Sequence, residues 1–234
     1  MWNLPLFAQH QPYGQLTITR FWPLREPTVR PVHIQIVPLA TPAGSAAAHF
    51  IQCIYQQKYA SSIEVSYPHL MVLYGQNDQI LAAAGFREAA EEPLFLEQYL
   101  GQPIESLLDA SRQQIVEIGN LASAGGGASL FLFAALASYL NHKGYVHAVV
   151  TSTKQLEKRF TLLGLRPRRL AVATAEALTL SAQSWGGYYA TEPQVMAGRI
   201  DKSARRLGLL FGITLQGTHQ TATYVKPSLA GALS

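Results

Sequence analysis

One acidic residue inside an apolar strand pattern, followed by three consecutive glycines, forms the stretch best suited to chemistry. Glu117 is the only charged residue in the segment 115–121, whose residue types favour a strand. Burial in a sheet raises the pKa of a carboxyl toward that of a useful general base. Gly125–Gly127 then open an apolar helix, where backbone N–H groups and the positive end of the helix dipole can face a phosphate. The pattern predicts a proton acceptor beside a phosphate site.

Simpler interpretations of the same residues stay open at this point. Glu117 as a buried charge paired with an arginine such as Arg87 is one alternative. Glycines that only let a helix and a strand pack closely are another. The aromatic residues around Trp185 raise the same question, because such clusters form cores more often than ligand pockets. The choice depends on the elements that position these residues.

The composition indicates a large hydrophobic core without a disulfide framework. The chain has 234 residues, 48% hydrophobic and 14% charged, enough for one large domain or a domain with an extension. Cys53 is its one cysteine, which indicates a reducing compartment and therefore a cytoplasmic location. The N-terminal residues lack the pattern of a secretory signal, and the longest apolar candidate, 129–140, is too short to span a membrane.

Charge is unevenly distributed along the chain. Residues 1–150 hold 7 Lys and Arg against 10 Asp and Glu, whereas residues 151–234 hold 11 against 4. A basic C-terminal part suits an anionic lipid surface, an acidic carrier or a phosphate-bearing cofactor. Nucleic-acid motifs are absent from the sequence, the seven histidines show no metal-ligand spacing, and no Gly-x-Ser-x-Gly motif marks a serine nucleophile. We therefore expect no nucleic-acid partner, no metal and no serine hydrolase.

Hydrophobic periodicity predicts a mixed α/β (α+β) fold in three parts. Residues 1–31 are rich in Pro and aromatics and predict an extended N-terminal arm, 32–178 a core, and 179–234 a C-terminal extension packed on that core. The element order indicates a mixed central sheet flanked by helices. Expected strands are 32–39, 70–74, 80–86, 115–121, 145–151, 170–175 and a last one at 207–215; expected helices are 47–59, 104–111, 130–140 and one ending at 164, with a capping box formed by Ser152 and Gln155.

This order resembles the GNAT acyltransferase superfamily, and within it the acyl-homoserine-lactone synthases. The similar features are Glu117 in a strand, the glycine turn, the apolar helix ending at Gly144, and the segment Gly85-Phe86-Arg87. At family level the chain resembles the bacterial thermostable hemolysin family. The blocks that carry this likeness are Phe95-Leu96-Glu97-Gln98-Tyr99-Leu100, Ile115-Val116-Glu117-Ile118-Gly119-Asn120-Leu121-Ala122 and Trp185-Gly186-Gly187-Tyr188-Tyr189, which with their flanks span roughly half of the chain.

The resemblance implies acyl transfer from a thioester, with roles for particular residues. Glu117 would be the base, and Asn120 would orient substrate or donate to the thioester carbonyl. Phe160 stands where many GNAT enzymes have a tyrosine acid, and a low-pKa thiolate can leave without that hydroxyl. The donor site would comprise Leu121, Ser123, Gly125, Gly126, Gly127, Ser129 and Lys154; the substrate site would comprise Arg87, Glu97, Tyr99, Trp185, Tyr188 and Tyr189.

The expected function is N-acyl transfer to a small amine or amino acid, giving a membrane-active or signalling lipid. The GNAT loop's basic residue and alternating glycines are replaced by Ala-Gly-Gly-Gly-Ala at 124–128, so acyl-CoA and acyl carrier protein both stay open as co-substrates, with no tightly bound cofactor. The alternative is a membrane-active, hemolysin-like protein without turnover. Peripheral contact with a membrane stays open under either interpretation.

Overall fold

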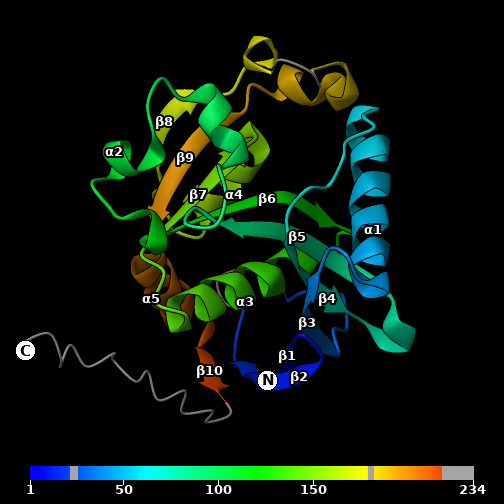
Figure 1. Cartoon of the computed structure of the whole chain (residues 1–234). Coiled ribbons are helices and arrows are strands. Elements are labelled where there is room, and N and C mark those ends of the chain that lie inside the picture. Colours follow the sequence, from blue (N-terminus) through cyan, green and yellow to red (C-terminus); the bar gives the residue numbers. More distant parts are fainter. Residues whose placement is uncertain (22–25, 179–181, 218–234) are drawn as a thin grey trace, which may run out of the picture.

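The computed structural model describes residues 1–21, 26–178 and 182–217 and forms one ten-stranded mixed sheet with helices on both faces (Figure 1). The strand order is β10-β2-β1-β3-β4-β5-β6-β7-β9-β8. The predicted mixed sheet flanked by helices is therefore confirmed. The strands are β1 Trp2–Ala8, β2 Gln11–Ile18, β3 His33–Pro38, β4 His69–Tyr74, β5 Ile80–Glu88, β6 Ile115–Ser123, β7 His147–Ser152, β8 Arg168–Val172, β9 Gln194–Arg199 and β10 Ile213–Gly217.

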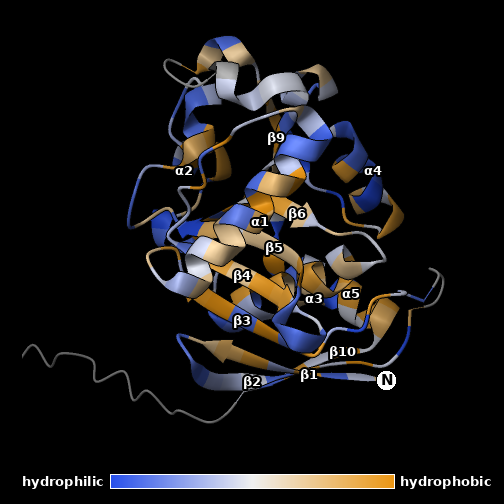
Figure 2. Ribbon diagram, turned by 90° about the vertical axis from the view of Figure 1, so that its right-hand side faces the viewer, coloured by the Kyte–Doolittle hydropathy of each residue, from blue (hydrophilic) through white to orange (hydrophobic). Residues whose placement is uncertain are grey.

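Helices cover the two faces with separate cores. Helix α1 (Pro42–Tyr59) packs on one face through Ala47 and Ile51. Helices α3 (Ala128–His142) and α5 (Ile200–Phe211) pack on the other face, where α3 is apolar on nearly every side because it lies between the sheet and α5. Figure 2 shows hydrophobic residues along the central strands and α3, and hydrophilic residues on α4 and on part of α1. The remaining helices are short: α2 Ile104–Leu108 and α4 Lys154–Leu162.

The N-terminal residues belong to the sheet, contrary to the expectation of an arm. β1 and β2 form an antiparallel hairpin, and β1 also pairs in parallel with β3, so the strand predicted at 32–39 is the third and not the first. Gln9 and His10 make the hairpin turn with positive φ of 49° and 63°. The turn lacks the Gly or Asn that usually signals such a hairpin, which is why the sequence pattern missed it.

The C-terminal segment also differs from the expectation. The apolar run 207–215 was predicted to be one strand, but Gly212, with φ of 60°, ends α5 and separates it from β10. β9 lies between β7 and β8, and β10 pairs with β2 at the far edge. Strands from all three predicted segments therefore share one sheet.

β6 and β7 separate partway along their length, and this opening positions the site. They pair in parallel only from Ile115 opposite His147 to Ile118 opposite Val150, although β6 continues to Ser123. The β5 register shifts in the same region, and Asn120 takes a positive φ of 49°. Such a bulge bends its strand, so β6 leaves β7 at Gly119.

Candidate active site

A cleft of about 840 Å³ occupies the opening between β6 and β7. The cleft extends from the α1 face of the sheet to the face covered by α3 and α5, because residues from all three helices line it. Its centre is formed by the bulged part of β6 and the end of β7. Lining residues there are Gly119, Asn120, Leu121, Ser123, Val150 and Thr151.

Aromatic side chains form the wall on the α1 face. Trp185 lies 5.1 Å from Tyr188 and 5.6 Å from Phe95, measured between ring centroids. The Tyr99 hydroxyl is 2.6 Å from that of Tyr189. Asn120 and Tyr55 of α1 both line the cleft and interact with each other. The aromatic cluster is thus both a core and one wall of the cleft.

The wall on the opposite face is mainly apolar and has a group of basic side chains at one end, which we call the basic mouth. Apolar side chains from α3, α4 and α5 line it: Phe133, Leu136, Ala137, Leu140, Phe160 and Leu207. Basic side chains gather toward the β8 and α5 side: Arg166, Arg168, Arg199, Lys202 and Arg206. Such a wall suits an apolar chain attached to an anionic group.

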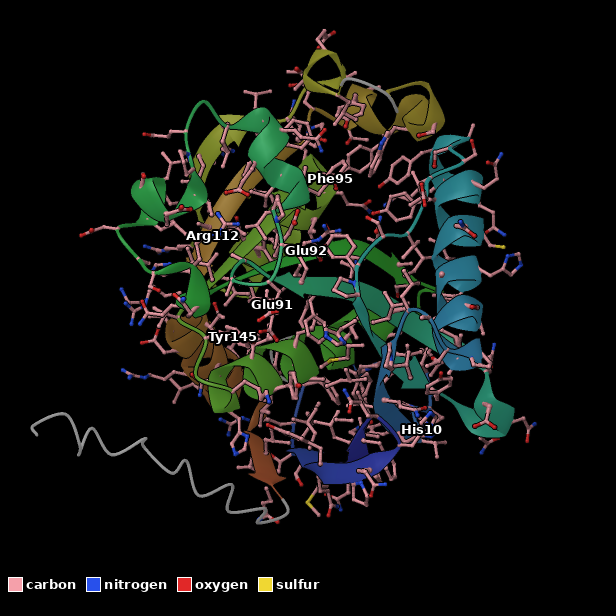
Figure 3. The ribbon with its side chains drawn as sticks, viewed as in Figure 1. His10, Glu91, Glu92, Phe95, Arg112 and Tyr145 are labelled. Carbon is pink, nitrogen blue, oxygen red and sulfur yellow. The ribbon has the colours of Figure 1, made fainter. Side chains whose placement is uncertain are left out.

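Glu117 is buried behind the cleft, with an exposed fraction of 1%. Its Oε2 accepts from the Phe95 N–H at 2.8 Å, and its Oε1 accepts from the Leu96 N–H at 3.1 Å. Phe95, labelled in Figure 3, begins the 3-10 helix Phe95–Tyr99 over this part of the sheet. Burial raises the pKa of Glu117 to about 7, against the opposing effects of Arg87 and the two N–H donors. A carboxyl with this pKa can accept a proton near neutral pH.

Arg87 is the ion-pair partner of Glu117, as the simpler interpretation proposed. Its Nε lies 3.5 Å from Glu117 Oε2, and its guanidinium lies 4.5 Å from the Tyr67 ring centroid. It also donates to Ser66 Oγ at 3.0 Å. Tyr67 interacts with Glu117 as well and lines the cleft. Arg87 itself lies outside the cleft lining, so its direct role is to hold Glu117 and Tyr67.

Glu97 stabilises the turn that covers Glu117. Its carboxylate accepts from the N–H groups of Leu94 and Ile104 and from Arg112 at 2.7 Å. These donors lower the pKa of Glu97 although burial opposes them. Arg112, labelled in Figure 3, also reaches Glu105. Glu97 lies outside the cleft.

The glycine turn reaches the cleft at one of its three residues. Gly125–Gly127 all have positive φ, between 59° and 97°, so each position strains any other residue type. Gly125 lines the cleft, and its N–H donates to Ser123 Oγ. Gly126 and Gly127 pack instead against residues 27–29, and the Gly126 carbonyl accepts from the Thr28 N–H at 2.9 Å. Close packing therefore accounts for two of the three glycines.

The two remaining donor-site residues are Ser129, in the first turn of α3, and Lys154, the first residue of α4. Ser129 Oγ accepts from Arg159 of α4 at 3.1 Å, which brings a guanidinium beside the start of α3. Arg159 lines the cleft. It places a positive charge near the glycine turn, which has no basic residue of its own. Lys154 pairs with Glu192 at 2.7 Å on an exposed surface.

The structure brings together seven of the fifteen predicted site residues in the cleft lining. These are Tyr99, Asn120, Leu121, Ser123, Gly125, Trp185 and Tyr188; the other eight, Arg87, Glu97, Glu117, Gly126, Gly127, Ser129, Lys154 and Tyr189, lie beside or behind it. Tyr67 and Arg159 were missed. Tyr67 lies in a segment without periodicity, and Arg159 reaches the α3 start only through tertiary packing.

The fold is shared with solved acyl-transferring synthases. The CoA-dependent acyl-homoserine lactone synthase BjaI, solved with SAM and isopentyl-CoA, matches with a TM-score of 0.54 at 13% identity over 76% of this chain and 89% of that chain. The acyl-homoserine-lactone synthase LasI matches at 0.52 and 15% over 80% and 98%. FeeM, an N-acyl amino acid synthase from uncultured soil microbes, matches at 0.50 and 13% over 75% and 94%. At such low identities, the TM-scores show a shared fold and no more.

Sequence comparison then places the chain in a family. The model of the thermostable hemolysin family matches residues 38–204, and the protein belongs to this family. No curated protein matches the chain in sequence. Both resemblances inferred from the sequence blocks are therefore confirmed. Within the described residues, no helix is long and apolar enough to cross a membrane.

Proposed function

We propose that the protein is an N-acyltransferase that moves an acyl group from an acyl thioester to a small amine or amino acid. The observation that carries this proposal is the cleft at the separation of β6 and β7, with an aromatic wall on one face and an apolar, basic wall on the other. A transferase needs two different substrates to meet at one point. The solved structures with this fold include an acyl-homoserine lactone synthase and an N-acyl amino acid synthase, and both names agree with the proposal.

The donor occupies the face of α3 and α5 in this proposal. Its acyl chain lies along the apolar residues of α3, where each buried methylene contributes about 0.8 kcal/mol. Its phosphate groups lie near Ser123, Gly125 and Arg159, or at the basic mouth. Acyl-CoA and a phosphopantetheine-bearing carrier protein both carry the acyl thioester on an arm that ends in phosphate. The basic residues suit either donor.

The acceptor enters along the aromatic wall. Its amine nitrogen attacks the thioester carbonyl, Asn120 donates a hydrogen bond to the developing oxyanion, and Glu117 accepts the amine proton. The C–N bond forms as the C–S bond breaks, and the thiolate leaves. Phe160 lines the cleft without a hydroxyl, so the thiolate departs unprotonated and takes its proton afterwards.

A thiol-release screen tests this proposal. Acyl-CoA and acyl carrier protein of several chain lengths are offered with a panel of amines and amino acids, and free thiol and acylated product are quantified. We expect amine-dependent release whose kcat/KM rises as pH passes about 7, because Glu117 must be unprotonated. Glu117→Gln should lose about 10²-fold or more in kcat while retaining the fold.

Hemolysis separates acyl transfer from direct membrane activity. If lysis comes from the acylated product, purified protein lyses cells only when donor and amine are supplied, and Glu117→Gln abolishes that lysis. Lysis by protein alone, undiminished in Glu117→Gln and without thiol release, would instead identify a membrane-active protein without turnover.

A further inference from the structure

Glu117 and the cleft are separated by one side chain, that of Tyr67. Glu117 is 1% exposed and lies behind the cleft, whereas Tyr67 lines the cleft and interacts with the Glu117 carboxylate. A substrate amine in the cleft therefore reaches the Tyr67 hydroxyl before it reaches Glu117. If Glu117 is the base, the amine proton needs a route from the cleft to its carboxylate.

Two glycines facing each other in the sheet make the space that the Tyr67 ring fills. Gly85 of β5 pairs with Gly119 of β6. A Cβ on Gly85 would lie 2.5 Å from Tyr67 Cγ, and one on Gly119 would lie 2.0 Å from Tyr67 Oη. The ring therefore lies across both strands, with its hydroxyl over Gly119. That is the residue at which β6 leaves β7, so the hydroxyl stands at the opening of the cleft.

The ring is held by charge as well as by packing. The Arg87 guanidinium lies 4.5 Å from the ring centroid, and the same guanidinium pairs with Glu117. The carboxylate oxygens accept from the Phe95 and Leu96 N–H groups, which fix the position of Glu117. These contacts hold both the Tyr67 ring and the Glu117 carboxylate in place.

We propose that Tyr67 is a catalytic residue that relays the acceptor's proton from the cleft to Glu117. As the neutral amine nitrogen attacks the thioester carbonyl, its proton moves to Tyr67 Oη and the Tyr67 proton moves to the Glu117 carboxylate. The C–S bond then breaks, and the proton returns from Glu117 through Tyr67 to the thiolate. Acyl thioester and amine become amide and free thiol without any other reactant. This inference rests on the proposed acyl transfer.

The ionisation of the two groups agrees with this direction of transfer. Burial and Glu117 raise the pKa of Tyr67 well above 10, so the resting tyrosine keeps its proton and donates it to the carboxylate. Glu117, with a pKa of about 7, is the final proton acceptor. Tyr67 is therefore neutral before and after each proton transfer.

Three variants and a control test the relay in the full chain. Tyr67→Phe keeps the ring and removes only the hydroxyl; Glu117→Gln removes the acceptor; the double variant removes both. Tyr74→Phe is the matched control, because Tyr74 is a buried tyrosine of β4 outside the cleft. We expect Tyr67→Phe to lower kcat by about 10²-fold or more with little change in KM, and the double variant to fall no further than Glu117→Gln. Tyr74→Phe should match wild type.

A second readout follows the carboxyl without turnover. Infrared difference spectra, with Glu117→Gln to identify the band, titrate Glu117 in wild type and in Tyr67→Phe. Because the Tyr67 hydroxyl lowers the pKa of Glu117, the titration should move to higher pH in Tyr67→Phe. A shifted band together with the kinetic pattern supports the relay.

Other outcomes overturn the relay in distinguishable ways. If wild type turns over and Tyr67→Phe stays within about threefold of it, or the two single losses multiply in the double variant, Glu117 acts without Tyr67. An unmoved carboxyl band refutes the contact in solution. If no donor and amine give thiol while the band still shifts, acyl transfer itself is refuted and the relay with it, and only the contact survives.

Discussion

Glu117 combines a structural role with the proposed chemical one. Its two oxygens anchor the turn before Tyr99 by accepting the Phe95 and Leu96 N–H groups, so its removal affects the fold as well as the reaction. Glutamine keeps the shape and one acceptor oxygen, whereas alanine would leave two buried donors and Arg87 without their acceptor. For this reason Glu117→Gln is the informative substitution.

The buried carboxyl also makes stability depend on pH. Because burial raises the pKa of Glu117 to about 7, the folded protein holds this proton more tightly than the unfolded chain. Its contribution is fully present below about pH 4.5 and is lost as pH rises through 7, a change of roughly 3 kcal/mol in the free energy of unfolding. Urea unfolding between pH 5 and 8 should show wild type losing stability relative to Glu117→Gln. A difference between the two proteins that stays constant across this range would contradict the assigned pKa.

At the residue scale the sequence indicated the pair of Glu117 and Arg87 but not the contacts of Tyr67. Glu117 stands out because a charge inside an apolar strand is costly unless it is paired, and Arg87 was a named partner. Tyr67 gave no such signal: its position depends on two glycines, 18 and 52 residues further along the chain, that become neighbours only when β5 and β6 pair. Contacts created by strand register are not visible in local patterns.

Helix α4 shows how one element brings several residues to the cleft. Arg159 and Phe160 line the cleft from this helix. Its N-cap is Thr153, whose Oγ1 accepts from the Leu156 N–H at 3.3 Å, and not Ser152, as the capping-box pattern suggested. Ser152 is fully buried at the end of β7. The strand therefore extends one residue further than the pattern indicated.

Loss of the α4 cap should weaken donor binding. Thr153→Ala removes the acceptor for the Leu156 N–H and should cost about 1 kcal/mol of stability. A less stable α4 holds Arg159, which lies in its last turn, less firmly, so the donor KM should rise more than kcat falls. Steady-state kinetics and thermal unfolding measure both effects. Thr153→Ser keeps an acceptor oxygen and should behave like wild type; equal effects of Ala and Ser would show that capping is not the cause.

Elements with regular periodicity were predictable, and those set by turn geometry were not. The helix at 47–59 and the strand, glycine turn and helix around Gly125 appear as expected, because each buries a continuous apolar face or has clear stop signals. The hairpin at Gln9 and the end of α5 at Gly212 were missed or misplaced. Both depend on residues with positive φ, two in the hairpin turn and one at the end of α5, that the local sequence pattern did not reveal.

At the scale of the molecule, the two ends of the described chain close one edge of the sheet together. β2 lies between β1 and β10, and Trp2 and Phe21 both contact Phe131 of α3 with ring centroids 5.3 Å apart. Figure 1 shows these strands beneath α3. Helix α3, which follows the glycine turn, thus packs in a core to which the N-terminal strands contribute side chains. The first residues therefore support the side of the cleft that α3 lines.

A single core substitution in β2 tests whether this edge is integral to the fold. Leu16 is fully buried, whereas its neighbour Gln15 faces solvent. Leu16→Ala should lower the free energy of unfolding by about 2–5 kcal/mol, and Gln15→Ala should change it by less than about 0.5 kcal/mol. Denaturant unfolding compares the two variants. A peripheral arm would instead leave Leu16→Ala as stable as Gln15→Ala.

The Tyr67 ring across Gly85 and Gly119 gives a criterion for reading related sequences. A side chain at either glycine position would occupy the space of the ring, so the three positions must change together in evolution. A relative that carries tyrosine with both glycines retains the space for the proposed relay. One that carries a larger residue at either glycine must have lost the ring from this place, and its proton acceptor must meet substrate by another route. Tyrosine retained beside a bulky residue at 119, on the same backbone, would contradict this account.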